Sequence, residues 1–84
     1  MGPASKQKRY LFTGGGHWLK ERVDSSIKLE DGSLWQVNLV DRIVCSLWLC
    51  NEKIVVAKNQ NPDYPYLLIN TDDGEKVEAR LISD

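Results

Sequence analysis

The side chains best suited to chemistry in this chain are two pairs of neighbouring carboxylates. Glu30-Asp31 and Asp72-Asp73 each supply the two acidic groups that acid–base hydrolysis requires. Each pair is followed directly by a glycine, and Asp-Gly is typical of a tight hairpin turn that faces solvent. Neither stretch matches the D-x-[DN]-x-[DN]-G pattern of a calcium-binding loop. We therefore expect both pairs to be turn residues, and we expect no enzymatic activity.

Nucleophilic and metal chemistry would have to use His17, Cys45 and Cys50. The cysteines are five residues apart, which is not the CxxC spacing of redox-active motifs. Structural zinc takes four ligands, and His17 is the only histidine in the sequence. The sequence predicts no metal and no cofactor. It favours two small apolar cysteines near the core, with a Cys45–Cys50 disulfide as the alternative.

A basic stretch near the start of the chain offers a nucleic-acid alternative. Lys6, Lys8 and Arg9 could contact phosphates, and Tyr10 and Phe12 beside them could stack on bases. Three cations provide little affinity by themselves, and the net charge of the whole chain is −1. The interpretation that we favour is a solvated terminus.

The length and composition predict one small soluble-type domain. The chain has 84 residues, of which 42% are hydrophobic and 27% charged, as in ordinary globular proteins. Gly14-Gly15-Gly16 lacks the lysine of a phosphate loop and is typical of a joint. We predict a flexible tail over residues 1–16 and a β domain over residues 17–84. The chain shows no signal peptide and no apolar run long enough to span a membrane.

Hairpin patterns dominate the rest of the sequence. An Asp31-Gly32 turn joins two alternating segments, and an Asp73-Gly74 turn joins two more. Together with one further β-rich run, these segments predict five strands, which lie at 27–29, 34–37, 54–57, 66–70 and 76–81. In the last strand, Val77, Ala79 and Leu81 are expected to face inward.

Three segments between these strands have less regular patterns. Residues 17–23 could form a helical turn or an extended lead-in. Residues 40–49 contain an apolar stripe at helical spacing, although a strand remains the alternative. We favour a short helix or helical turn there. Residues 58–65 contain two prolines and are predicted to form a loop. The stripe consists of Val40, Ile43, Val44, Leu47 and Trp48.

A sheet this small must close or fold over to cover its apolar face. The predicted fold is therefore mostly β, a small five-stranded antiparallel barrel or two-layer sandwich of SH3-like or OB-like size. Trp35 and Trp48 are expected in its core, because a small domain needs the large area that a tryptophan buries. The alternative is an exposed aromatic surface of Tyr64, Tyr66 and Trp48 that binds an extended peptide.

The order of residues also resembles a group of small uncharacterised bacterial β-domain proteins. The likeness covers residues 27–82 and rests on a D-G-S-x-W hairpin at 31–35 and a V-x-A-R closing strand at 77–80. At Asn51-Glu52 this chain departs from the Gly-Asp that is usual in the group. The resemblance implies a fold but no activity. Because members often look exported, it also implies an extracytoplasmic location, and the sequence leaves the compartment open.

These observations favour a non-enzymatic, monomeric domain that binds a protein or peptide. Nucleic-acid binding through the basic tail is the first alternative. The second is a structural or accessory domain that associates with itself along an edge strand.

Overall fold

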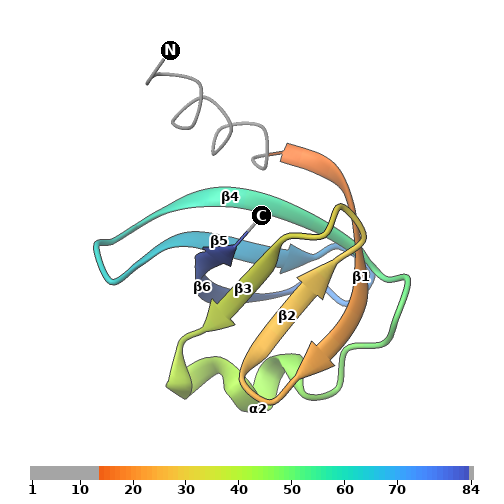
Figure 1. Ribbon diagram of the computed structural model, residues 1–84, viewed down its shortest axis with the longest axis horizontal. Coiled ribbons are helices and arrows are strands. Elements are labelled where there is room, and N and C mark those ends of the chain that lie inside the picture. Colours follow the sequence, from red (N-terminus) through yellow and green to blue (C-terminus); the bar gives the residue numbers. More distant parts are fainter. Residues whose placement is uncertain (1–13, 84) are drawn as a thin grey trace.

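Six antiparallel strands form the body of the molecule. The computed structural model describes residues 14–83, and the prediction of a small, mostly β domain is confirmed. Between Val37 and Lys53 the chain forms a 3₁₀ turn, η1 (Leu39–Asp41), and a short helix, α2 (Arg42–Cys45), in the region where the sequence favoured a helical turn (Figure 1). The strands are β1 (Gly14–Val23), β2 (Ser26–Leu29), β3 (Leu34–Val37), β4 (Lys53–Asn61), β5 (Tyr64–Asn70) and β6 (Glu75–Ser83).

The sheet closes on itself in the order β1-β2-β3-β6-β5-β4, because β1 pairs with β4 as well as with β2. The closure is irregular. Register shifts interrupt four of the six strand pairs: β1–β2, β1–β4, β3–β6 and β4–β5. Such shifts bend and twist strands sharply, which allows six short strands to enclose a core without forming a regular barrel.

The hairpin of β2 and β3 follows its sequence pattern closely. Ile27 pairs with Trp35, and Gly32 in the turn has a φ of 92°, a conformation that suits glycine. Ile27 and Trp35 face inward, whereas the residues beside them along each strand are half-buried. The alternation of the two strands therefore places one face of the hairpin in the core, as predicted.

The sixth strand, β1, is the main difference from the sequence prediction. Gly14 to Gly16 was predicted to be a joint and residues 17–23 a helical turn or lead-in, but all of them belong to one strand. His17 pairs with Ile54 of β4, and Arg22 pairs with Ile27 of β2. Pairing with β4, in which Gly14 lies opposite Val56, outweighs the weak strand preference of glycine. The rest of the predicted tail, residues 1–13, lies outside the described residues.

The predicted loop at 58–65 is also wrong, because β4 and β5 continue through it as a projecting hairpin (Figure 1). Tyr66 pairs with Lys58, and Tyr64 pairs with Asn61. The register shifts between these two pairs, and Pro65 lies inside the shifted stretch. A proline is tolerated there because the regular ladder of hydrogen bonds, to which it could not donate, is interrupted by the register shift.

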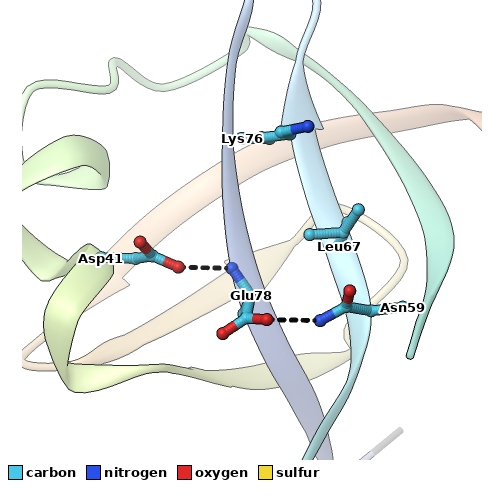
Figure 2. A pocket seen from close by; sticks show the side chains of 5 residues that line it. All are labelled: Asp41, Asn59, Leu67, Lys76 and Glu78. Carbon is cyan, nitrogen blue, oxygen red and sulfur yellow. Dashed lines mark hydrogen bonds between the residues drawn. The ribbon is translucent and has the colours of Figure 1, made fainter. Parts of the chain in front are cut away.

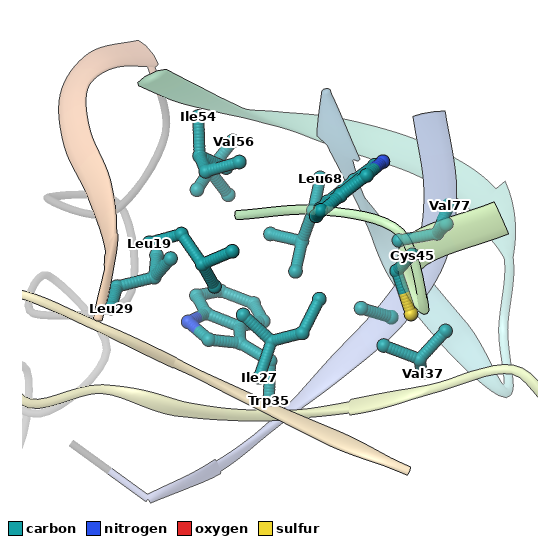
Figure 3. Packing of buried hydrophobic residues seen from close by; sticks show 12 residues of the cluster. Leu19, Ile27, Leu29, Trp35, Val37, Cys45, Ile54, Val56, Leu68 and Val77 are labelled. Carbon is teal, nitrogen blue, oxygen red and sulfur yellow. The ribbon is translucent and has the colours of Figure 1, made fainter. Parts of the chain in front are cut away.

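The core is centred on Trp35, which is fully buried and packs edge-on against Tyr66 with ring centroids 5.1 Å apart. Val77 and Ala79 of β6 are buried and Leu81 is partly buried against the core, as the alternation predicted. Figure 3 shows side chains of this cluster converging from the strands and from α2. The cluster consists of Leu19, Ile27, Leu29, Trp35, Val37, Cys45, Trp48, Ile54, Val56, Leu68, Val77 and Ala79.

Within residues 14–83, no helix has the length and apolar character needed to cross a membrane.

Candidate functional site

The segment that carries η1 and α2 is attached firmly to β6. The backbone N–H of Asn38 donates to the carbonyl oxygen of Glu78 at 2.9 Å, and the backbone N–H of Glu78 donates to Asp41 Oδ2 at 2.8 Å. The Asn38 side chain caps η1 by accepting from the N–H of Val40. The segment therefore has a fixed position on the sheet although its helix is only four residues long.

This segment has an inner and an outer face. Cys45 and Trp48 are buried in the core, and Val44 packs against it. On the other side, five large aliphatic side chains are between 64% and 81% exposed, and we call this surface the aliphatic ridge. The predicted apolar stripe is thus divided between core and solvent. The aliphatic ridge consists of Leu39, Val40, Ile43, Leu47 and Leu49.

A partly open cavity of about 340 Å³, with both polar and apolar lining, lies where this segment meets the sheet. Figure 2 shows its lining: Asp41 from η1, Asn59 from β4, Leu67 from β5, and Lys76 and Glu78 from β6. The cavity brings together carboxylates, an amide and an ammonium group from three elements, and β5 contributes Leu67. The sequence did not group these residues as a site, because the elements that carry them are far apart along the chain.

The Glu78 carboxylate is held by three asparagine side chains. It accepts from Asn38 Nδ2 at 2.7 Å, from Asn59 Nδ2 at 2.8 Å and from Asn61 Nδ2 at 3.3 Å. The bonds from Asn59, Asn38 and Asn61 lower the pKa of Glu78 because they favour its ionised form. Glu78 therefore joins β6, the β3–η1 link and the β4–β5 hairpin. Its bonding is suited to holding structure rather than to moving protons.

We expect Glu78→Gln to weaken the dependence of stability on acid. Because folding lowers the pKa of Glu78 from 4.5, its contribution to stability is present above that value and is lost as the pH falls through the folded pKa. Melting temperatures measured between about pH 6 and pH 3 should fall more steeply for the wild type than for the variant. Glu21→Gln, at an exposed position of β1, is the matched control. Equal slopes for wild type and Glu78→Gln would contradict the role of the asparagine bonds.

The aromatic surface considered from the sequence does not form as predicted. Trp48 is fully buried, and its Nε1 donates to Glu75 Oε1 at 3.1 Å, so Trp48 cannot line an exposed groove. Tyr66 is half-buried because its ring packs on Trp35. Tyr64 is half-buried beneath the guanidinium of Arg80, 5.4 Å from the ring centroid. Trp48 lies beyond the end of α2, and its backbone N–H donates to the carbonyl oxygen of Cys45 at 3.1 Å. Both side chains are buried in the core.

The two cysteines are free, so the alternative of a disulfide between them is not realised. Cys45 points into the core, and burial raises the pKa of its thiol. Cys50 is exposed and lies 3.1 Å from the carbonyl oxygen of Lys20. The nucleic-acid candidates Lys6, Lys8 and Arg9 lie outside the described residues.

A polar network around Asp31 could not be foreseen from the sequence. Ser33 Oγ donates to Asp31 Oδ1 at 2.6 Å and accepts from Trp35 Nε1 at 2.8 Å. His17 Nδ1 lies 3.5 Å from Asp31 Oδ2. Ser33 is fully buried and its hydroxyl already bridges two partners, so this network fixes the β2–β3 turn against β1 and the core. The only sequence signal was the Asp-x-Ser spacing of a turn.

The second acidic pair also belongs to a turn. Asp72 Oδ2 accepts from the N–H of Lys53 at 3.0 Å, and Asn70 Oδ1 accepts from the N–H groups of Asp72 and Asp73. Desolvation, followed by the charges of nearby carboxylates, raises the pKa of Asp73.

Among residues 14–83, no three histidine, cysteine or acidic side chains are grouped so as to hold a metal ion.

The fold and these contacts define a small β domain with a closed, irregular sheet and an exposed aliphatic ridge. No protein-family model matches the sequence, and comparisons with curated proteins and with solved structures found no match.

Proposed function

We propose that this chain is a non-enzymatic protein-interaction module that binds a protein partner through the aliphatic ridge. The observation that carries the proposal is the exposure of five large aliphatic side chains within residues 39–49. Single exposed leucines are common on protein surfaces, whereas five exposed aliphatic side chains within one short segment favour an interaction site.

The ridge is not needed to cover the core. Cys45 and Trp48 already provide the inward contacts of the same segment, and Asp41 fixes it to β6. Burying a side chain such as Ile43 or Leu47 in a partner would contribute about 1.5–3 kcal/mol before the costs of association. Burial of the ridge in a partner would therefore contribute free energy of binding, and the ridge side chains are not required to cover the core.

The attachment of the ridge also favours binding. The bonds of Asn38 and Asp41 to Glu78 hold the segment at both ends of η1, and Cys45 holds the end of α2 in the core. A surface that is ordered before it meets its partner loses less conformational entropy on association. This arrangement supports binding by a preformed surface.

The alternatives suggested by the sequence have less support. Nucleic-acid binding would depend on Lys6, Lys8 and Arg9, which lie outside the described residues. Self-association along an edge strand could use only short stretches, because the closed order gives every strand two neighbours; among the described residues, β4 beyond Val56 is one such stretch and pairs with β5 alone.

Site-specific photo-crosslinking in cells that naturally produce this protein would test the proposal. A photoreactive phenylalanine derivative replaces Leu47 in the ridge, and the control carries it at Gln60, an exposed residue of β4. We expect a discrete protein adduct from position 47 that is absent from position 60. Identical adducts from both positions, or none from position 47, would count against the ridge as a binding surface.

A further inference from the structure

We propose that Asp73 is a site of spontaneous backbone modification, where aspartate becomes isoaspartate through a cyclic imide formed with Gly74, and that this change loosens the attachment of Trp48. The site is separate from the aliphatic ridge and does not depend on the proposed function. Glycine follows aspartate at two places in the chain, Asp31-Gly32 and Asp73-Gly74, and both pairs lie in turns between strands. The contacts of the two turns differ, and the difference selects Asp73.

The reaction needs only these two residues and water. The backbone nitrogen of Gly74 attacks Cγ of the protonated Asp73 carboxyl group. A C–N bond forms, a C–O bond breaks, and the hydroxyl group leaves with the amide hydrogen as water. The product is a five-membered succinimide ring. Water that adds to the backbone carbonyl carbon of residue 73 breaks its bond to nitrogen and gives isoaspartate, whereas water that adds to Cγ restores aspartate. Nothing is oxidised or reduced.

The carboxylate of Asp31 is held by its neighbours. Its Oδ1 accepts from the backbone N–H of Ser33 at 2.9 Å and from Ser33 Oγ at 2.6 Å, and its Oδ2 lies 3.5 Å from His17 Nδ1. Ring closure requires the carboxyl group to turn onto the nitrogen of Gly32, so these contacts must first break. Hydrogen bonds to a charged group are among the stronger ones, and the fold therefore slows the reaction at this turn.

The carboxylate of Asp73 is held much more weakly. Among residues 14–83, it accepts one side-chain hydrogen bond, from Asn70 Nδ2 at 3.5 Å. The same amide nitrogen donates to Glu52 Oε1 at the shorter distance of 2.8 Å. Asp73 and Gly74 are both exposed, so water can reach the ring once it forms. The carboxyl group can therefore turn onto the nitrogen of Gly74 at little cost.

The two attacking amides have similar surroundings. The N–H of Gly74 donates to the carbonyl oxygen of Asn70 at 2.7 Å, and the N–H of Gly32 donates to that of Leu29 at 2.9 Å. The two glycines also have similar φ angles of 78° and 92°. Neither glycine has a side chain that would hinder the attacking nitrogen. The carboxyl groups, and not the amides, therefore distinguish the two turns.

The charges around Asp73 favour the reactive form of its carboxyl group. Desolvation, followed by the negative charges of Glu52, Glu75 and Asp72, raises the pKa of Asp73. At mildly acidic pH, a larger fraction of this side chain is therefore protonated than for an aspartate with an ordinary pKa. The protonated group reacts more readily, because it loses its oxygen as water.

Isoaspartate would alter the start of β6. It sends the main chain through Cβ and Cγ of residue 73 and so lengthens the turn by one main-chain atom. Glu75 follows two residues later, and its Oε1 accepts from Trp48 Nε1 at 3.1 Å. We expect the longer turn to displace Glu75 and to break this bond, which joins the segment after α2 to the sheet.

Ageing of the folded wild-type protein, followed by peptide mapping, tests the site. The protein is kept in mildly acidic buffer at physiological temperature and then digested with trypsin, which places the two turns in peptides 29–42 and 59–76. Electron-transfer fragmentation distinguishes isoaspartate from aspartate and locates it. We expect isoaspartate to form at residue 73 at least about tenfold faster than at residue 31.

Unfolded protein provides the control for the role of the fold. In concentrated guanidinium chloride the contacts of both turns are lost, and the two rates should become similar. Asp73→Glu is the control for the chemistry, because glutamate would need a less favourable six-membered ring. This variant keeps the negative charge and should form no isoaspartate at this turn.

Indole N–H signals in NMR spectra measure the structural consequence. In the isoaspartate-containing fraction, purified by chromatography, the signal of Trp48 should shift. The signal of Trp35, whose indole donates to Ser33 beside the other turn, should stay in place. After the same ageing, the Asp73→Glu variant should keep both signals unchanged.

Equal rates at residues 31 and 73 of the folded protein, or a faster rate at 31, would overturn the assignment of the site. Isoaspartate that forms at both residues in guanidinium chloride but at neither in the folded protein would also overturn it. An unchanged Trp48 signal in the isoaspartate-containing fraction would overturn the proposed effect on the attachment of that residue.

Discussion

Trp35→Ala is expected to remove a large part of the free energy of unfolding of the protein. Trp35 is fully buried at the centre of the core, packs edge-on against Tyr66, and donates its indole N–H to Ser33. Truncating a buried tryptophan costs about 3–5 kcal/mol. A domain of this size has a total stability of about 5–10 kcal/mol, so the loss removes a large part of it. The variant also leaves the buried hydroxyl oxygen of Ser33 without its indole donor, which adds to the cost.

Urea titration followed by circular dichroism measures this effect. Trp18→Ala is the matched control, because Trp18 lies in β1 with 42% of its surface exposed. The control should retain a cooperative transition close to that of the wild type. A Trp35→Ala transition as stable as that of Trp18→Ala would show that Trp35 is not the centre of the core.

The second large effect is expected for Trp48→Ala, again about 3–5 kcal/mol of unfolding free energy. Trp48 is fully buried although it lies next to the exposed Leu47 and Leu49. Its loss removes the main side chain that packs the segment after α2 into the core. The indole also donates to Glu75 at the start of β6, so the variant loses a hydrogen bond between that segment and the sheet.

Two further variants resolve the contributions at Trp48. Trp48→Phe retains most of the apolar contact and loses the indole hydrogen bond, for which we expect about 1 kcal/mol. Leu47 lies next to Trp48 but on the ridge. Leu47→Ala should change the free energy of unfolding by less than about 0.5 kcal/mol. Equal effects of Trp48→Ala and Leu47→Ala would contradict the division into an inner and an outer face.

Local patterns in the sequence predicted the hairpins well. The alternation of Ile27 with Leu29, the turn at Gly32 and the closing strand around Val77 all depend on neighbours in the chain. Such signals can be read from the sequence because strand period and turn chemistry are local properties. Asn51 is a related case. It has a φ of 71°, which asparagine tolerates better than most residues.

The sequence could not predict the contacts between residues that are far apart in the chain. Nothing near Gly14 indicates a strand, because β1 is stabilised by β2 and β4. Pro65 favoured a loop in the sequence. A strand tolerates it only because the register between β4 and β5 shifts there, and the sequence does not show that shift. The cavity around Glu78 combines residues from four elements and has no local signature.

The ridge illustrates a further limit of sequence patterns. Val40, Ile43 and Leu47 fit the period of an amphipathic helix as well as Val44 and Trp48 do, and periodicity does not reveal which side of a stripe faces the core. The bond from the backbone of Glu78 to Asp41 sets the orientation of the segment. The exposure of Val40, Ile43 and Leu47 therefore depends on the position of β6 in the fold, which the sequence pattern does not show.

The two long-range pairs, β1–β4 and β3–β6, also affect the order in which the chain can fold. The hairpins β1–β2, β2–β3, β4–β5 and β5–β6 join strands that are adjacent in sequence, so each can form at a small cost in loop entropy. The pairing of His17 with Ile54 and that of Trp35 with Leu81 must instead bring together distant parts of the chain. Contacts of this kind slow folding because their entropy is lost before most of their stabilisation is gained. The pairs β1–β4 and β3–β6 are thus expected to form after the hairpins, and until then the edges of β1, β3, β4 and β6 are open to other chains.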